Sequence, residues 1–123
     1  MTDYERLGGA DALEHLIDLF IDVVFDDFII GFWFKGKDRE RIKRHEVEHA
    51  AKILGGPSRY TGRPIVPLHK PLGINKGHFR RRLAILTKVL TDEGVEEDVI
   101  ERWLAHDRKL QDQITDGSDC APR

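Results

Sequence analysis

The sequence predicts an all-α fold in one domain, and three observations support this prediction. Apolar residues recur at three- and four-residue steps over four separate segments, which is the spacing of one face of an α-helix. Glycine and proline separate these segments, as at Gly8-Gly9, Gly55-Gly56-Pro57 and Gly94. No stretch of the chain alternates apolar and polar side chains as a half-buried strand would.

The first long helix is expected over residues 10–25. A short leading turn precedes it, in which Thr2 and Glu5 have the spacing of a capping box. The apolar residues of this helix are predicted to share one buried face: Leu13, Leu16, Ile17, Phe20, Val23 and Val24. A compact apolar corner is expected next, over residues 28–34, which include Phe32, Trp33 and Phe34.

The second helix is expected over residues 38–54, with Gly55 placed to end it. It carries an ordinary apolar stripe of Val47, Ala50, Ala51 and Leu54. Beside that stripe lies a mixed one of Ile42, His45, Glu46, His49 and Ile53. Burying such polar groups unpaired costs about 1–3 kcal/mol each, so a helix that only packs would rarely carry them.

Two further helices complete the expected fold, one starting near Asn75 and the other near Glu96. Their predicted buried residues are Phe79, Leu83, Leu86 and Leu90 in the third helix, and Val99, Ile100, Trp103, Leu104 and Leu110 in the fourth. We therefore expect a folded domain at residues 1–113 and a polar, disordered tail at residues 114–123.

A long connection at residues 55–74 joins the second helix to the third. Structureless segments of this length are uncommon in compact domains and tend to be functional. His69 lies in it between Leu68 and Leu72, with prolines at positions 67 and 71. Such a histidine suits a metal ligand in an apolar pocket, but these residues alone favour a histidine at the core edge that hydrogen-bonds to the backbone. His15, His78 and His106 are interpreted as surface or helix-edge residues.

A second candidate site is His45-Glu46-Val47-Glu48-His49, which matches the H-E-x-x-H signature of zinc peptidases on a predicted helix. In that chemistry the histidines bind zinc and the glutamate activates water. The motif is short, no strand is predicted to hold a substrate, and a third ligand would have to come from His69 or His78. A zinc-dependent hydrolase is therefore kept as the alternative from another functional class.

Composition and charge exclude several classes of protein. The formal net charge is −2, so no basic field points to nucleic acid, and the basic clusters at residues 35–44 and 80–82 are interpreted as solvated helix faces. The longest apolar stretch, residues 28–34, is far shorter than the roughly 20 residues that span a bilayer. The N-terminus has no secretory pattern, and Cys120 has no partner for an internal disulfide. We expect a cytoplasmic protein without a membrane or nucleic-acid partner.

Four stretches, in order and at matching separations, resemble the truncated haemoglobins, most closely the first of their subgroups. They are Tyr4-Glu5-Arg6-Leu7-Gly8-Gly9, the corner Phe32-Trp33-Phe34, the run Leu54-Gly55-Gly56-Pro57-Ser58-Arg59-Tyr60-Thr61-Gly62, and Leu68-His69-Lys70-Pro71-Leu72-Gly73-Ile74 followed by His78-Phe79. The resemblance covers the chain from Tyr4 to about Leu104. It implies a truncated globin with a two-over-two helical sandwich around haem b.

The resemblance also implies roles for individual residues. His69 becomes the proximal ligand of the iron, which reverses the preference from the residues alone. Phe34, Phe79 and Trp103 are expected as walls of the haem pocket. The residues expected near the haem propionates are Tyr60, Lys70, Arg41, Lys43 and Arg44. His106 lies in the last helix, where some relatives attach haem covalently, but its spacing does not match theirs and no such bond is predicted.

The distal side departs from the common family pattern. Ile21 stands where many relatives carry a tyrosine, and Ile42 and Glu46 stand where polar residues and a glutamine are common. His45 falls where some cyanobacterial members carry a sixth iron ligand, so His45 is a possible distal ligand and is otherwise turned to solvent or a propionate. His49 is the alternative distal group, as a hydrogen-bond donor to oxygen.

Arg82 is a second departure, because relatives mostly have an aliphatic residue there on the haem side of the third helix. We expect Arg82 to form an ion pair with Glu46 over the haem, since a lone guanidinium there would be costly.

The function expected from this resemblance is reversible binding of oxygen, nitric oxide or carbon monoxide. Nitric oxide detoxification, electron transfer and redox sensing are the roles considered, with nitric oxide dioxygenase or peroxidase-like side activity left open. Turnover would need an unidentified reductase, and the chain is expected to be a monomer or a weak dimer. A globin-like interaction domain without haem is the third possibility.

Overall fold

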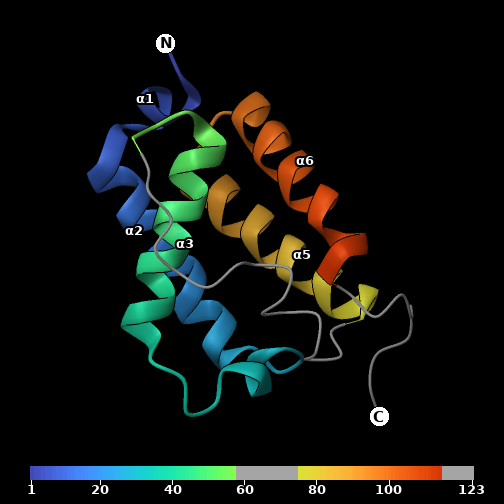
Figure 1. Cartoon of the computed structure of the whole chain (residues 1–123). Helices are drawn as coiled ribbons and strands as arrows, with labels where there is room; N and C mark the ends of the chain where they lie inside the picture. Colours follow the sequence, from blue (N-terminus) through green and yellow to red (C-terminus); the bar gives the residue numbers. More distant parts are fainter. Residues whose placement is uncertain (58–74, 115–123) are drawn as a thin grey trace.

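Helices are the only regular elements in the part of the chain that the structure, a computed structural model, describes, residues 1–57 and 75–114 (Figure 1). They are α1 (Asp3–Leu7), α2 (Gly9–Asp26), the 3₁₀ turn η1 (Gly31–Phe34), α3 (Arg39–Leu54), α5 (Lys76–Asp92) and α6 (Glu97–Ile114). Helix α2 packs against α1, α3 and α5, while α6 packs against α5 and α3. In Figure 1, α2 and α3 lie on one side of the molecule, and α5 and α6 lie side by side on the other.

The two helix pairs, α2 with α3 and α5 with α6, confirm the predicted all-α fold and its two-over-two arrangement. Within the described ranges, no helix combines the length and the apolar character needed to cross a membrane. Helix α6 ends at Ile114, the residues beyond it lie outside the described ranges, and the division into a domain at residues 1–113 and a tail stays a prediction.

Local capping explains where the helices begin and end. The Thr2 hydroxyl accepts a hydrogen bond from the Glu5 N–H, and the Glu5 carboxylate accepts one from the Thr2 N–H, which confirms the predicted capping box. Asp38 caps α3 by accepting from the Arg41 N–H at 3.2 Å. Gly55 ends α3 with a φ of 83°, in the left-handed region that favours glycine.

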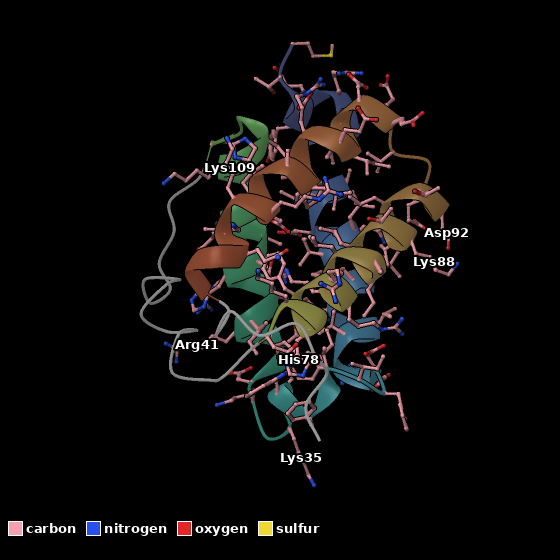
Figure 2. The ribbon with its side chains drawn as sticks, turned by 90° about the vertical axis from the view of Figure 1, so that its right-hand side faces the viewer. Lys35, Arg41, His78, Lys88, Asp92 and Lys109 are labelled. Atoms are coloured by element: carbon pink, nitrogen blue, oxygen red, sulfur yellow. The ribbon has the colours of Figure 1, made fainter. Side chains whose placement is uncertain are left out.

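His78 is buried, which corrects its interpretation as a surface or helix-edge residue. The ring Nδ1 of His78 accepts a hydrogen bond from the backbone N–H of Asn75 at 3.1 Å. The backbone N–H of His78 donates to Asn75 Oδ1 at 2.9 Å, so the two residues cap α5. The ring also lies edge-on to Trp33 and Phe32, with centroids 5.6 and 5.9 Å away. Figure 2 shows His78 at the start of α5, next to the η1 turn. Packing by this turn removes His78 from solvent.

The buried core confirms the predicted helix faces, with one correction on α2. Val23 is 47% exposed, whereas Ile21 is only 1% exposed. Helices α3 and α5 both pack against α2. The buried face of α2 therefore includes Ile21, while Val23 lies outside it. The other predicted residues of α2, α5 and α6 are buried, apart from Leu110, which is half-buried as is Val47 on α3.

The turn between α2 and α3 is less compact than predicted. Phe28 is 100% exposed and Phe32 is 54% exposed, while Trp33 and Phe34 are half-buried. Gly31 is the tightly packed position of the turn, because a Cβ there would lie 2.7 Å from the Phe25 carbonyl oxygen. The turn therefore presents some of its aromatic side chains outward and holds its backbone against the end of α2.

Asp27 holds this turn together. One oxygen of its buried carboxylate accepts from the N–H groups of Ile29 and Ile30 at 2.9 and 3.0 Å, and the other accepts from Arg81 of α5 at 2.6 Å. The hydrogen bond from Arg81 holds the pKa of Asp27 below its ordinary value.

The change Asp27→Ala is expected to lower the free energy of unfolding by about 1–3 kcal/mol, because the Ile30 N–H loses its acceptor in a part-buried site. Asp26→Ala is the matched control, since the neighbouring Asp26 side chain is 80% exposed and should matter little. Urea unfolding followed by circular dichroism measures both variants. Equal losses in the two would contradict the role given to Asp27.

Candidate functional site

The mixed polar and apolar stripe of α3 lies at the edge of the hydrophobic core. Its members are all half-buried: Ile42, His45, Glu46, His49 and Ile53. The prediction that these polar groups lie near the core edge is therefore confirmed. Ile42 and Ile53 also pack against the hydrophobic core, so polar and apolar groups share one face of α3.

An ion cluster joins α3, α5 and α6 inside the molecule. Arg82 donates to both carboxylate oxygens of Glu46, at 2.9 and 3.3 Å, and to Asp107 at a longer 3.4 Å. Its guanidinium also lies over the Phe20 ring of α2, 5.0 Å from the centroid. The predicted Arg82–Glu46 pair is present, and each of its two side chains is about one-fifth exposed.

Asp107 is the member of this cluster that the sequence analysis missed. Its side chain is 2% exposed, and its Oδ1 atom is buried with no hydrogen-bond partner among the described residues. A signal was available, because Asp107 lies four residues after Trp103 and three after Leu104 on the buried face of α6. An aspartate in that register needs a partner, and Arg82 supplies it from another helix.

Burial and the neighbouring charges shift the pKa values of this cluster. Burial raises the pKa of Asp107, although Arg82 opposes the effect. Burial alone would lower the pKa of Arg82, but the charges of Glu46 and Asp107 outweigh it and raise the pKa above its ordinary value. Burial lowers the pKa of His49, so its imidazole is mostly neutral at neutral pH. The interior thus contains a fixed cation, carboxyl groups and a neutral histidine.

The apolar residues expected as pocket walls lie in the core or at its edge. Phe79 and Trp103 are each 2% exposed, and Ile21 is 1% exposed. Phe34 is half-buried and stacks on Phe25, with ring centroids 5.1 Å apart. Ile21 offers no hydrogen-bond donor on α2, so the polar groups of the interior come from α3, α5 and α6.

Several predicted site residues lie outside the described part of the chain or have other partners. Tyr60, His69 and Lys70 fall within residues 58–74, which lie outside the described ranges. Lys43, expected near the haem propionates, contacts Asp18 and Asp22 of α2 through its ammonium group, each at 3.0 Å. Arg41 and Arg44 are exposed.

The geometry gives no support to the zinc hydrolase. Among residues 1–57 and 75–114, no three histidine, cysteine or carboxylate side chains come together as a metal site. Glu46, which would have to activate water, contacts Arg82 through both of its oxygens.

The described residues do fit a haem group. Haem needs apolar contacts over its ring and polar groups at the iron. Phe34 and Ile42 lie at the edge of the core, and the ion cluster lies beside the stripe of α3 that carries His45. The buried Trp33 Nε1 atom also has no hydrogen-bond partner within the described ranges, so its N–H is a donor available near the turn.

The fold and this interior define an all-helical protein of the two-over-two globin class. A family model, "Bacterial-like globin", matches residues 2–116. A group 1 truncated haemoglobin of Mycolicibacterium paratuberculosis is 36% identical over 115 residues, which cover 93% of this chain and 84% of that protein. One of Tetrahymena pyriformis is 30% identical over 111 residues, 88% of this chain and 92% of that protein.

Solved structures agree with these matches. The crystal structure of the Tetrahymena pyriformis truncated haemoglobin in its Fe(III) form has a TM-score of 0.87 and 26% identity, over 96% of this chain and 100% of that chain. The 2/2 haemoglobin of Synechococcus, with covalently attached haem, has a TM-score of 0.83 and 26% identity, over 92% and 95% of the two chains. The chain belongs to the bacterial-like globin family, among the group 1 truncated haemoglobins, and the cofactor of this family is haem.

Proposed function

We propose that this chain holds haem b through His69 and binds small diatomic ligands at the opposite face of the haem. The observation that supports this most is the half-buried stripe of α3 with His45, Glu46 and His49, next to the interior ion cluster. When bound, haem supplies an iron atom with a coordination position for oxygen, nitric oxide or carbon monoxide. The residues of this chain orient the group and set the polarity around the ligand.

The polar side of the pocket is assigned to Arg82 and His49. Arg82 is held in place by Glu46 and Asp107, so its remaining N–H groups have a defined direction. Neutral His49 carries one ring N–H. Since Ile21 has no donor, we expect Arg82 and His49 to favour ligands that accept a hydrogen bond, such as oxygen, over carbon monoxide.

Nitric oxide detoxification, electron transfer and redox sensing are the roles that fit such a site. Each needs electrons delivered to the bound haem, so a separate reductase is part of the proposal. The measurement that tests haem binding is an absorption spectrum of the purified protein with parallel metal analysis. Stoichiometric haem with a sharp Soret band is expected. Stoichiometric zinc without haem would overturn the proposal in favour of the hydrolase.

His45 is proposed as the sixth ligand of the iron when no external ligand is present. The reduced protein is then expected to give the split visible bands of low-spin haem, and His45→Ala to give a high-spin spectrum. His49→Ala is the matched control, one turn further along α3, and should keep the low-spin bands. Low-spin bands that survive in His45→Ala and vanish in His49→Ala would assign the ligand to His49 instead.

A further inference from the structure

The interior ion cluster holds one cation against two carboxyl groups. Arg82 contacts Glu46 through two hydrogen bonds, at 2.9 and 3.3 Å, but reaches Asp107 through a single one at 3.4 Å. Glu46 is also about one-fifth exposed, whereas the Asp107 side chain is almost fully buried. The positive charge of Arg82 is therefore shared mainly with Glu46, and Asp107 is the surplus carboxyl group of the interior.

One oxygen of Asp107 is placed to carry a proton. The Oδ1 atom is buried and has no hydrogen-bond donor among the described residues, while Oδ2 accepts from Arg82. A buried charge is costly unless it is both paired and hydrogen-bonded, which is true of only one of these oxygens. A proton on Oδ1 removes the charge and leaves the contact with Arg82 in place.

The charges that face Asp107 come from the two helices packed against α6. Helix α5 contributes Arg82, and α3 contributes Glu46 and His49. The residues on either side of Asp107 along α6 are exposed. Burial raises the pKa of Asp107 and lowers the pKa of His49, so both groups favour their neutral forms. Because Glu46 and His49 are half-buried, they connect Asp107 with solvent, which supplies the protons.

Reduction of a bound haem makes the interior more negative by one unit of charge. This step rests on the proposed function, in which haem lies beside the stripe of α3 that carries Glu46 and His49. Added negative charge disfavours an ionised carboxyl group, and the effect is strong where water is excluded. Arg82 stays a cation and pairs with Glu46 through both carboxylate oxygens, so Asp107 is the member of the cluster that can respond by binding a proton.

We propose that Asp107 takes up one proton at Oδ1 when the haem iron is reduced and releases it when the iron is oxidised. The electron comes from a one-electron donor, the separate reductase or an electrode, and converts Fe(III) to Fe(II). The proton comes from solvent and forms an O–H bond on Asp107, so the total charge of the interior does not change. Acidification then favours the reduced protein, and a rise in pH favours the oxidised protein.

Potentiometric titration of the haem-loaded protein at a series of pH values tests this proposal. The midpoint potential of the wild type is expected to fall as the pH rises, with a slope that approaches a tenfold change in the reduction equilibrium per pH unit, about 59 mV for one electron. Asp107→Asn should remove this slope. Glu101→Gln is the matched control, because Glu101 is an exposed carboxylate of the same helix, and it should keep the slope.

The pH at which the two proteins differ separates a proton site from a structural effect. At low pH, where Asp107 carries a proton in both redox states, Asp107→Asn and the wild type should have the same potential. At high pH the variant should be reduced more readily, because it lacks the carboxylate. A variant that only distorts the pocket would instead shift the potential equally at every pH.

Redox difference infrared spectroscopy of the wild type gives a readout that needs no variant. Reduction should produce the C=O band of a protonated carboxyl group, and labelling aspartate with carbon-13 should shift this band, whereas a proton on Glu46 would give a band that the label leaves in place.

A potential independent of pH, a slope that survives in Asp107→Asn, or a band unmoved by the label would each overturn this inference alone. A chain that binds no haem would overturn the proposed function, and this inference with it.

Discussion

Replacing His69 with glycine is expected to lower haem retention more than any other single change in this chain. The proposed role of His69 is to hold the iron, and loss of groups that merely orient a metal ligand already costs about 10–100-fold in affinity. We expect His69→Gly to lose haem at least that readily. The measurement is the Soret absorbance per chain after gel filtration, together with the rate of haem transfer to an acceptor protein.

Two further samples make this prediction specific. Imidazole added to His69→Gly should enter the vacated space and restore the ligand-field bands of the wild type, because it replaces the missing ring. His106→Gly is the matched control, since His106 is an exposed histidine of α6. If His69→Gly keeps its haem and its spectrum, another residue holds the iron and the proposed proximal ligand is wrong.

The change Arg82→Met is expected to cause the largest loss of stability. It leaves the carboxylates of Glu46 and Asp107 in the interior without their cation, and removing one partner of a buried ion pair costs about 3–5 kcal/mol. Denaturant unfolding of the haem-loaded protein measures the loss. Lys88→Met is the control on the same helix, because its pair with Asp92 is exposed and should matter little.

The double variant Glu46→Leu with Arg82→Leu separates charge from packing. Replacing both members of a buried pair by apolar groups is often neutral, so the double variant should be more stable than Arg82→Met. Asp107 loses its cation in both variants, so equal losses would mean that the Glu46 charge contributes little and that the stranded Asp107 or packing by the arginine stem explains the effect.

The stability of Arg82→Met should also depend on pH with a defined sign. Burial raises the pKa of Asp107, so the folded chain binds more protons than the unfolded chain does, and acidification favours the folded state at this residue. Without Arg82 to oppose it, this effect grows. The stability deficit of the variant relative to the wild type is therefore expected to shrink as the pH is lowered from neutral.

Most of the fold could be predicted because it depends on residues close together in the chain. Thr2 with Glu5, Asp38 as a cap and Gly55 as a helix end are features within one turn, and the structure confirms them. The apolar stripe of α5 depends on the same short spacing. The pairing of Arg82 with Glu46 was also predicted, since two charged residues at interior helix positions require each other.

The corrections concern residues whose surroundings come from distant segments. Val23 and Ile21 both lie near the edge of the apolar stripe of α2, and the packing of α3 and α5 decides which of them is buried. His78 caps its own helix, but the η1 turn more than forty residues earlier encloses it.

Residue types at short spacing specify the helices, their caps, the family resemblance and the polar stripe of α3. Tertiary packing brings Asp107 together with Arg82 and Glu46, since these residues lie on three different helices. It also decided that Phe28 stays in solvent, because Asp27 fixes the turn against Arg81 of α5. Charge and burial at such places depend on which helices meet, and short-range patterns do not carry that information.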